Sequence, residues 1–229
     1  MYDNNDIIGY LQTNKILAIK LEHALTGVGK AVSNQAETIA KGTQRALYYA
    51  SCFTDEYQDV CKKQKIEDVR FKDGVTHLFQ KENIACEILR IYFEEVFRYK
   101  TADQIERIKK MLMAVNVHVA ASSLTSAGFA LAVACLVSMG MNLSLHISAL
   151  VGRRAAGLVG IAGAYGIVQK AADSAHRLYY LSPTYYAALY AQELEMMYFL
   201  VEPLFERASA FEQSASDVGI ADTITRMIR

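Results

Sequence analysis

The scarcity of proline constrains the fold more than any other feature of this sequence. The chain has 229 residues but only two prolines, Pro183 and Pro203, and both lie late in it. Proline breaks helices and marks turns, so a chain without it needs few loops. Neither alternating strand patterns nor hairpin dipeptides such as Asn-Gly occur. We therefore predict an all-α protein, a single helical bundle of roughly six to nine helices over residues 1–229.

The charged residues are distributed very unevenly along this chain. Residues 1–110 hold most of them, whereas residues 111–169 contain only the adjacent pair Arg153 and Arg154. This asymmetry predicts amphipathic shell helices over 1–110, apolar central helices over 111–169 and further helices over 170–229. The central helices are expected to form an apolar hairpin that the amphipathic helices wrap, because a monomer cannot expose so much apolar surface without aggregating.

Hydrophobic periodicity and cap residues predict where individual helices begin and end. Helices are expected near 7–25, 34–53 and 55–65, and one long helix over 73–100. Thr101 and Gln104 form a capping-box pattern that opens a helix running directly into the apolar region. Ser182-Pro183 begins another helix, which bends or stops near Pro203. The tail after Ala210 is only weakly periodic.

The apolar region is marginal for insertion into lipid. Residues 119–137 are long enough to cross a bilayer, and their strong apolar side chains favour insertion by about 2–4 kcal/mol. Several serines and a threonine oppose insertion, so the balance is close to zero. Arg153 and Arg154 would cost about 2.5–3.5 kcal/mol each at mid-membrane, so they must lie in a polar cavity, in water or at an interface, and we take them as interfacial charges. The candidate membrane-inserting residues are Phe129, Leu131, Val133, Leu136, Val137, Leu150, Val151, Leu158, Ile161 and Tyr165.

Small residues form one face of the segment that follows. Glycines at 157, 160, 163 and 166 carry roughly 3–4 kcal/mol of helix penalty, which close packing must offset. The predicted helix-packing face consists of Gly152, Ala156, Gly160, Gly163 and Ala164. Such a face suits packing inside lipid, and equally a central helix in a crowded bundle.

No catalytic, cofactor or metal motif is recognisable. The segment 26–31 lacks the first glycine and the hydroxyl of a phosphate-binding loop, and no HExxH or GxSxG pattern occurs. The equal numbers of acidic and basic residues argue against nucleic-acid binding. His118 and His146 are expected to be hydrogen-bonded core residues. We expect Cys52, Cys61, Cys86 and Cys135 to be thiols, as in a reducing cytoplasm. The sequence therefore predicts neither an enzyme nor a cofactor.

This arrangement, amphipathic helices around an apolar hairpin, resembles that of bacterial pore-forming toxins of the colicin kind. It is also similar to that of small membrane-depolarising secretion-system effectors. The uncharged run 111–152, the turn-like 138–142 and the small-residue segment 155–168 carry the resemblance, although Arg153-Arg154 interrupts the second arm. It implies an antibacterial effector that stays soluble until its apolar helices insert into a target bilayer. The alternative is a soluble all-α binding, adaptor or immunity protein with no membrane step.

The resemblance also implies partners and a location. The expected partners are a target-cell bilayer, a cognate immunity or chaperone protein and further copies in the membrane. The N-terminus lacks a basic region followed by an apolar one, so we expect synthesis in the cytoplasm without a signal peptide. Secretion would then take the protein to the target-cell inner membrane.

Overall fold

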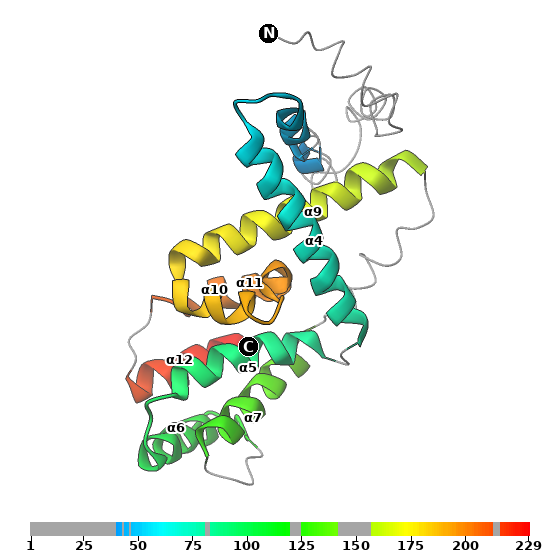
Figure 1. The fold of residues 1–229 in the computed structure, drawn as a ribbon. Coiled ribbons are helices and arrows are strands. Elements are labelled where there is room, and N and C mark those ends of the chain that lie inside the picture. Colours follow the sequence, from blue (N-terminus) through cyan, green and yellow to red (C-terminus); the bar gives the residue numbers. More distant parts are fainter. Residues whose placement is uncertain are drawn as a thin grey trace. The chain divides into compact units, whose positions relative to one another are not determined.

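The structure, a computed structural model, describes residues 40–42, 44–45, 47–80, 83–119, 125–141, 157–212 and 216–229. In this part of the chain 81% of the residues are helical and none lies in a strand, which confirms the all-α prediction. The described elements are eight α-helices and two short 3₁₀ helices (Figure 1).

The chain divides into two compact units. Unit 1 comprises Met1–Lys72 and Ser148–Asp173, and unit 2 comprises Asp73–Ile147 and Ser174–Arg229. Helices α4 (Gln58–Gln80) and α9 (Gly157–Leu181) each pass from one unit into the other. The predicted hairpin would turn through residues 142–156, which lie outside the described residues, so the hairpin and the single domain stay predictions.

Unit 1 contains a buried arginine at the centre of a polar network. Its described helices are η2 (Tyr49–Phe53) and the first parts of α4 and α9. The fully buried Arg45 donates to Asp68 at 2.6 and 3.0 Å, to Glu67 at 2.9 Å and to Gln169 at 3.2 Å. Two carboxylates and an amide therefore compensate the desolvation of one guanidinium. A disulfide also joins Cys52 to Cys61 in this unit.

Unit 2 is a bundle around helix α5. Its other helices pack on α5 and on one another, and Figure 1 shows α6, α7 and α12 gathered beside α5. The helices of this unit are α5 (Ile84–Phe97), α6 (Ala102–Ala114), α7 (Ser126–Met139), α10 (Pro183–Tyr190), η4 (Glu195–Leu200), α11 (Glu202–Ala208) and α12 (Asp217–Ile228).

Two predicted helix starts are confirmed. Thr101 accepts a hydrogen bond from the Gln104 amide, and the Gln104 side chain accepts one from the Thr101 amide, which completes the capping box of α6. Pro183 occupies the first turn of α10, where its missing N–H costs no hydrogen bond. The predicted extent of this helix is wrong, because α10 ends at Tyr190 and Pro203 lies in the first turn of a separate helix, α11.

Other predicted boundaries are wrong. The long helix expected over 73–100 is interrupted, because the Asn83 side chain accepts a bond from the Cys86 amide and caps a new helix. Helix α6 enters the apolar region by only four residues and ends at Ala114. Asn116 takes a left-handed conformation, and the Val117 amide donates to the Leu112 carbonyl at 2.9 Å, a Schellman-type helix end.

The C-terminal tail is better ordered than its sequence pattern suggested. Ser216 caps α12 by accepting a bond from the Gly219 amide, and one face of the helix is buried. The buried side chains of α12 are Ile220, Ala221, Thr223, Ile224 and Met227. Spacings of three and four residues place them on a single stripe. The tail is therefore part of the core of unit 2.

Candidate functional site

Helix α7 is the described part of the predicted membrane-inserting region. It has 14 residues and no charged side chain, and its only hydroxyls are Ser126 and Ser138. Thr125 caps it by accepting a bond from the Gly128 amide at 3.2 Å. Of the candidate inserting residues, Phe129, Val133 and Val137 are fully buried. The helix thus contributes a face to the bundle that is apolar except for Ser138.

The opposite face of α7 is also apolar but is open to solvent. Leu131 is 47% exposed and Met139 is 78% exposed, while Leu136 is half-buried. We expected Leu131 to be buried at the centre, and that prediction is wrong. Among the described helices, α5, α6 and α12 pack against α7, and the buried side chains of α7 lie on one face of it.

Three contacts hold α7 antiparallel to α5. Near the end of α7, Cys135 forms a disulfide with Cys86 in the first turn of α5. Next to it, the side-chain Nδ2 of Asn83 donates to Ser138 Oγ at 3.0 Å. At the start of α7, Phe129 packs on Phe97 at the end of α5.

The cysteine prediction was therefore wrong. All four cysteines form disulfides, and none is free. The partners are separated by 9 and 49 residues, and no motif in the sequence signals either pairing. A helix that returns antiparallel beside α5 brings Cys135 to Cys86, which only the tertiary fold reveals.

The remaining candidate residues belong to the second apolar segment. Leu150, Val151, Gly152, Arg153, Arg154 and Ala156 lie outside the described residues. Leu158, Gly160, Ile161, Gly163, Ala164 and Tyr165 belong to helix α9, but the environment of their side chains is likewise outside the described part. The glycine-rich segment is thus helical from Gly157 onward, and its proposed packing face stays a prediction.

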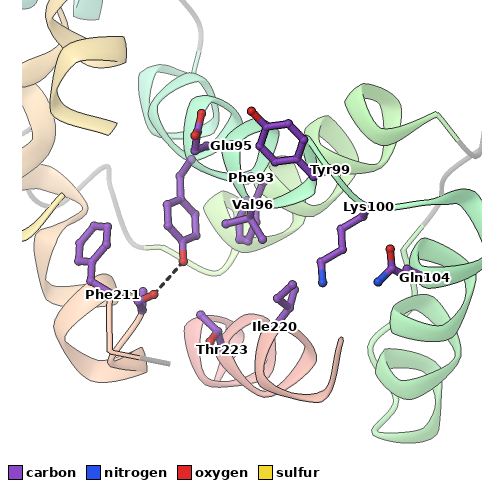
Figure 2. Close-up of a pocket in the computed structure, with 11 residues that line it drawn as sticks. Phe93, Glu95, Val96, Tyr99, Lys100, Gln104, Phe211, Ile220 and Thr223 are labelled. Carbon is purple, nitrogen blue, oxygen red and sulfur yellow. Dashed lines mark hydrogen bonds between the residues drawn. The ribbon is translucent and has the colours of Figure 1, made fainter. Parts of the chain in front are cut away.

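A cavity of about 490 Å³ lies between α5, α6 and α12 in unit 2. Figure 2 shows Val96 and Ile220 in its wall, with Lys100 beside them. Most polar side chains of the lining already have partners within the fold. Lys100 donates to Asp217 at 3.1 Å, Gln104 is part of the capping box, and the Thr223 hydroxyl donates to the Gly219 carbonyl. A specific ligand site usually offers convergent polar groups, and these are already engaged.

Buried tyrosines line this cavity and the neighbouring core. The Tyr92 hydroxyl donates to the Ala210 carbonyl at 3.1 Å, and the Tyr185 hydroxyl donates to the Ile88 carbonyl at 2.9 Å. Burial raises the pKa of both phenols above the usual value, so both stay protonated donors. They are structural hydrogen-bond donors.

The structure corrects one of the two histidine predictions. His118 is exposed, so its expected core role is wrong, and His146 lies outside the described residues. Among the residues that the structure describes, no cluster of three or more His, Cys, Asp or Glu side chains is arranged to hold a metal ion.

No helix in the described part of the chain combines the length and the apolar composition that crossing a bilayer requires. Helix α7, at 14 residues, is about 21 Å long, against about 30 Å for the hydrocarbon core.

In comparisons with known proteins, no protein-family model, no curated protein and no solved structure matches the chain.

Proposed function

We propose that the protein permeabilises membranes, and that helix α7 leaves the bundle to enter the bilayer of a target cell. One observation carries this proposal: α7 has no charge and is apolar on both its buried and its exposed face. Helices that are hydrophobic all round are normally enclosed, either in a protein core or in a membrane. Among the helices that the structure describes, α7 is covered on one side, and Leu131 and Met139 are exposed on the other.

Insertion would require more of the chain than α7 itself. The run without charges extends from residue 111 to residue 152, between Lys110 and Arg153. Forty-two residues are enough for two crossings of about 20 residues each. The turn at Asn116 and the coil of 117–119 would have to become helical, so insertion is a rearrangement. This is the behaviour that the resemblance to colicin-like toxins implies.

The two disulfides support passage of the protein through a compartment outside the reducing cytoplasm, because disulfides form and persist mainly in oxidising compartments. We therefore propose synthesis in the cytoplasm followed by export, with oxidation on the way. A target-cell inner membrane is the proposed destination.

Leu131 provides a sharp test, because its exposure allows a charge to be added without disturbing the bundle core. We expect Leu131→Lys to fold like the wild type, since exposed substitutions usually change stability by less than about 0.5 kcal/mol. The same lysine would add about 2.5–3.5 kcal/mol to insertion. Dye release by the reduced protein from vesicles of phosphatidylethanolamine and phosphatidylglycerol should therefore fall sharply.

Val218→Lys is the matched control. Val218 is 68% exposed on α12 and lies outside the uncharged run, so this variant should release dye like the wild type. Equal release by Leu131→Lys and the wild type would exclude α7 as the inserting element. If the wild type neither binds nor permeabilises vesicles in its oxidised or its reduced form, the binding-protein alternative is favoured instead.

A further inference from the structure

We infer that the Cys86–Cys135 disulfide is a redox-sensitive lock that keeps α7 on the bundle until a dithiol reductant opens it. The inference adds a regulatory step to the proposed membrane function, and the biological role of that step rests on the proposed function. Its structural part, the release of α7, can be tested without any membrane.

The position of the disulfide makes it a lock on this helix in particular. It joins the first turn of α5 to the last turns of α7, so the two helices cannot separate at that end while it is intact. The remaining attachments are non-covalent: the Asn83–Ser138 hydrogen bond and the packing of one apolar face. Such contacts open and close reversibly, whereas the covalent bond does not.

The geometry also leaves the bond open to attack from one side. Cys86 is buried at 6% exposure, but Cys135 is only half-buried. Cys135 lies four residues after Leu131 and four before Met139, on the ridge that carries the exposed side chains of α7. A thiolate can thus approach the sulfur of Cys135 from solvent. The matching sulfur of Cys86 lies in the core.

The reaction is an ordinary thiol–disulfide exchange. A thiolate of the dithiol attacks Cys135 Sγ, the S–S bond breaks, and Cys86 leaves with the electron pair and takes up a proton. The second thiol of the reductant then attacks the mixed disulfide and releases Cys135 as a thiol. The dithiol is oxidised to its disulfide, and its two electrons reduce the protein's cystine to two cysteines.

The expected effect is large. A disulfide that closes a loop of this size commonly shifts a folding equilibrium by roughly 30- to 900-fold. After reduction, α7 should open much more often, although its apolar face keeps it on the bundle for most of the time. A bilayer would then offer that face an alternative partner. Reduction therefore allows α7 to separate from the bundle, and binding to lipid then stabilises the separated helix.

The test uses the full chain and measures amide hydrogen exchange along residues 126–139. Exchange is measured with and without dithiothreitol for the wild type and for a Cys52→Ala/Cys61→Ala variant. In that variant Cys86–Cys135 is the one disulfide left to reduce. We expect dithiothreitol to speed exchange in α7 about tenfold or more in both proteins. A Cys86→Ala/Cys135→Ala variant should exchange rapidly without it. Unchanged exchange in α7 on reduction would overturn the lock.

Dye release from vesicles of phosphatidylethanolamine and phosphatidylglycerol separates the lock from the function. We expect the oxidised wild type to release little dye, and at least about tenfold more after reduction. The Cys52→Ala/Cys61→Ala protein should still need the reductant, and Cys86→Ala/Cys135→Ala should not. Equal release by oxidised and reduced wild type would overturn the lock while keeping the membrane function. Faster exchange in α7 without release from any protein would keep the lock and overturn the membrane function.

Discussion

The ring of Phe129 on α7 lies 5.0 Å, centroid to centroid, from the ring of Phe97 on α5, and both side chains are fully buried. This contact is at the end of the helix pair opposite the Cys86–Cys135 disulfide. Helix α7 is therefore attached to α5 at both ends, by a reducible bond at one and by apolar packing at the other. The two attachments can be weakened independently.

Weakening the apolar attachment should destabilise unit 2. Phe129→Ala is expected to lower the free energy of unfolding by about 3–5 kcal/mol, because it removes a large side chain and leaves a cavity. Leu131→Ala, on the exposed face of the same helix, should cost less than about 1 kcal/mol. Urea denaturation of both variants checks this. Similar losses for the two would mean that α7 does not pack as described.

The ion pair between Arg177 and Glu202 should matter more than a surface pair. Arg177 donates two hydrogen bonds to the Glu202 carboxylate, at 2.8 and 2.7 Å, and Glu202 is buried. Arg177→Ala would leave that carboxylate without its bidentate partner, and we expect a loss of about 1.5–3 kcal/mol.

The control for this variant is Arg226→Ala. Arg226 pairs with Asp222, and both side chains are about half exposed, so its removal should cost at most about 0.5 kcal/mol. Thermal denaturation distinguishes the two. If both substitutions lowered Tm equally, the Glu202 pair would be no stronger than a solvated one.

The first turn of α12 should make stability depend on pH. Desolvation, the largest single influence, raises the pKa of Asp217, but hydrogen bonds and charge from Lys100 and Arg107 outweigh it and hold that pKa below the usual 3.8. A carboxylate with a lowered pKa stabilises the fold above its unfolded pKa and loses that contribution as the pH falls. The difference in Tm between the wild type and Asp217→Asn should therefore be present at pH 7 and shrink below about pH 4. A difference independent of pH would contradict this assignment.

Unit 1 should require arginine, and not merely a positive charge, at position 45. The guanidinium of Arg45 donates to Asp68, Glu67 and Gln169, and also to the Gln64 carbonyl at 3.1 Å. A lysine ammonium is a point charge that cannot reproduce this planar set of bonds. Arg45→Lys is expected to cost about 2 kcal/mol or more in urea denaturation. A near-neutral result would show that the network contributes charge alone.

Local chemistry explains what could be predicted from the sequence. The Thr101–Gln104 capping box and the start of α10 at Pro183 depend on interactions within four residues, and both are present. The all-α class follows from composition in the same way. Asparagine is also a local signal for a helix start, as at Asn83, and for a helix end, as at Asn116. Both were missed because the apolar periodicity around them favoured continuous helices.

Tertiary features could not be predicted in this way. The pairing of Cys86 with Cys135 and the exposure of Leu131 depend on which face of α7 meets α5, and α7 is apolar on every face. A helix without a polar side gives no sequence signal for its orientation. The burial of α12 was missed for the opposite reason: its amphipathic stripe is clear, but it is short and follows a polar stretch.

The transfer of α7 from the bundle into lipid can be measured directly, because the chain contains no tryptophan. A single Leu131→Trp substitution places a unique fluorophore on the exposed face of α7, and Val218→Trp places a control on α12. After reduction and addition of vesicles with brominated acyl chains, we expect the emission of Leu131→Trp to shift to shorter wavelength and to be quenched, while that of Val218→Trp stays unchanged. Emission from Leu131→Trp that remains unquenched, while the same reduced protein releases dye, would show that α7 does not enter the bilayer.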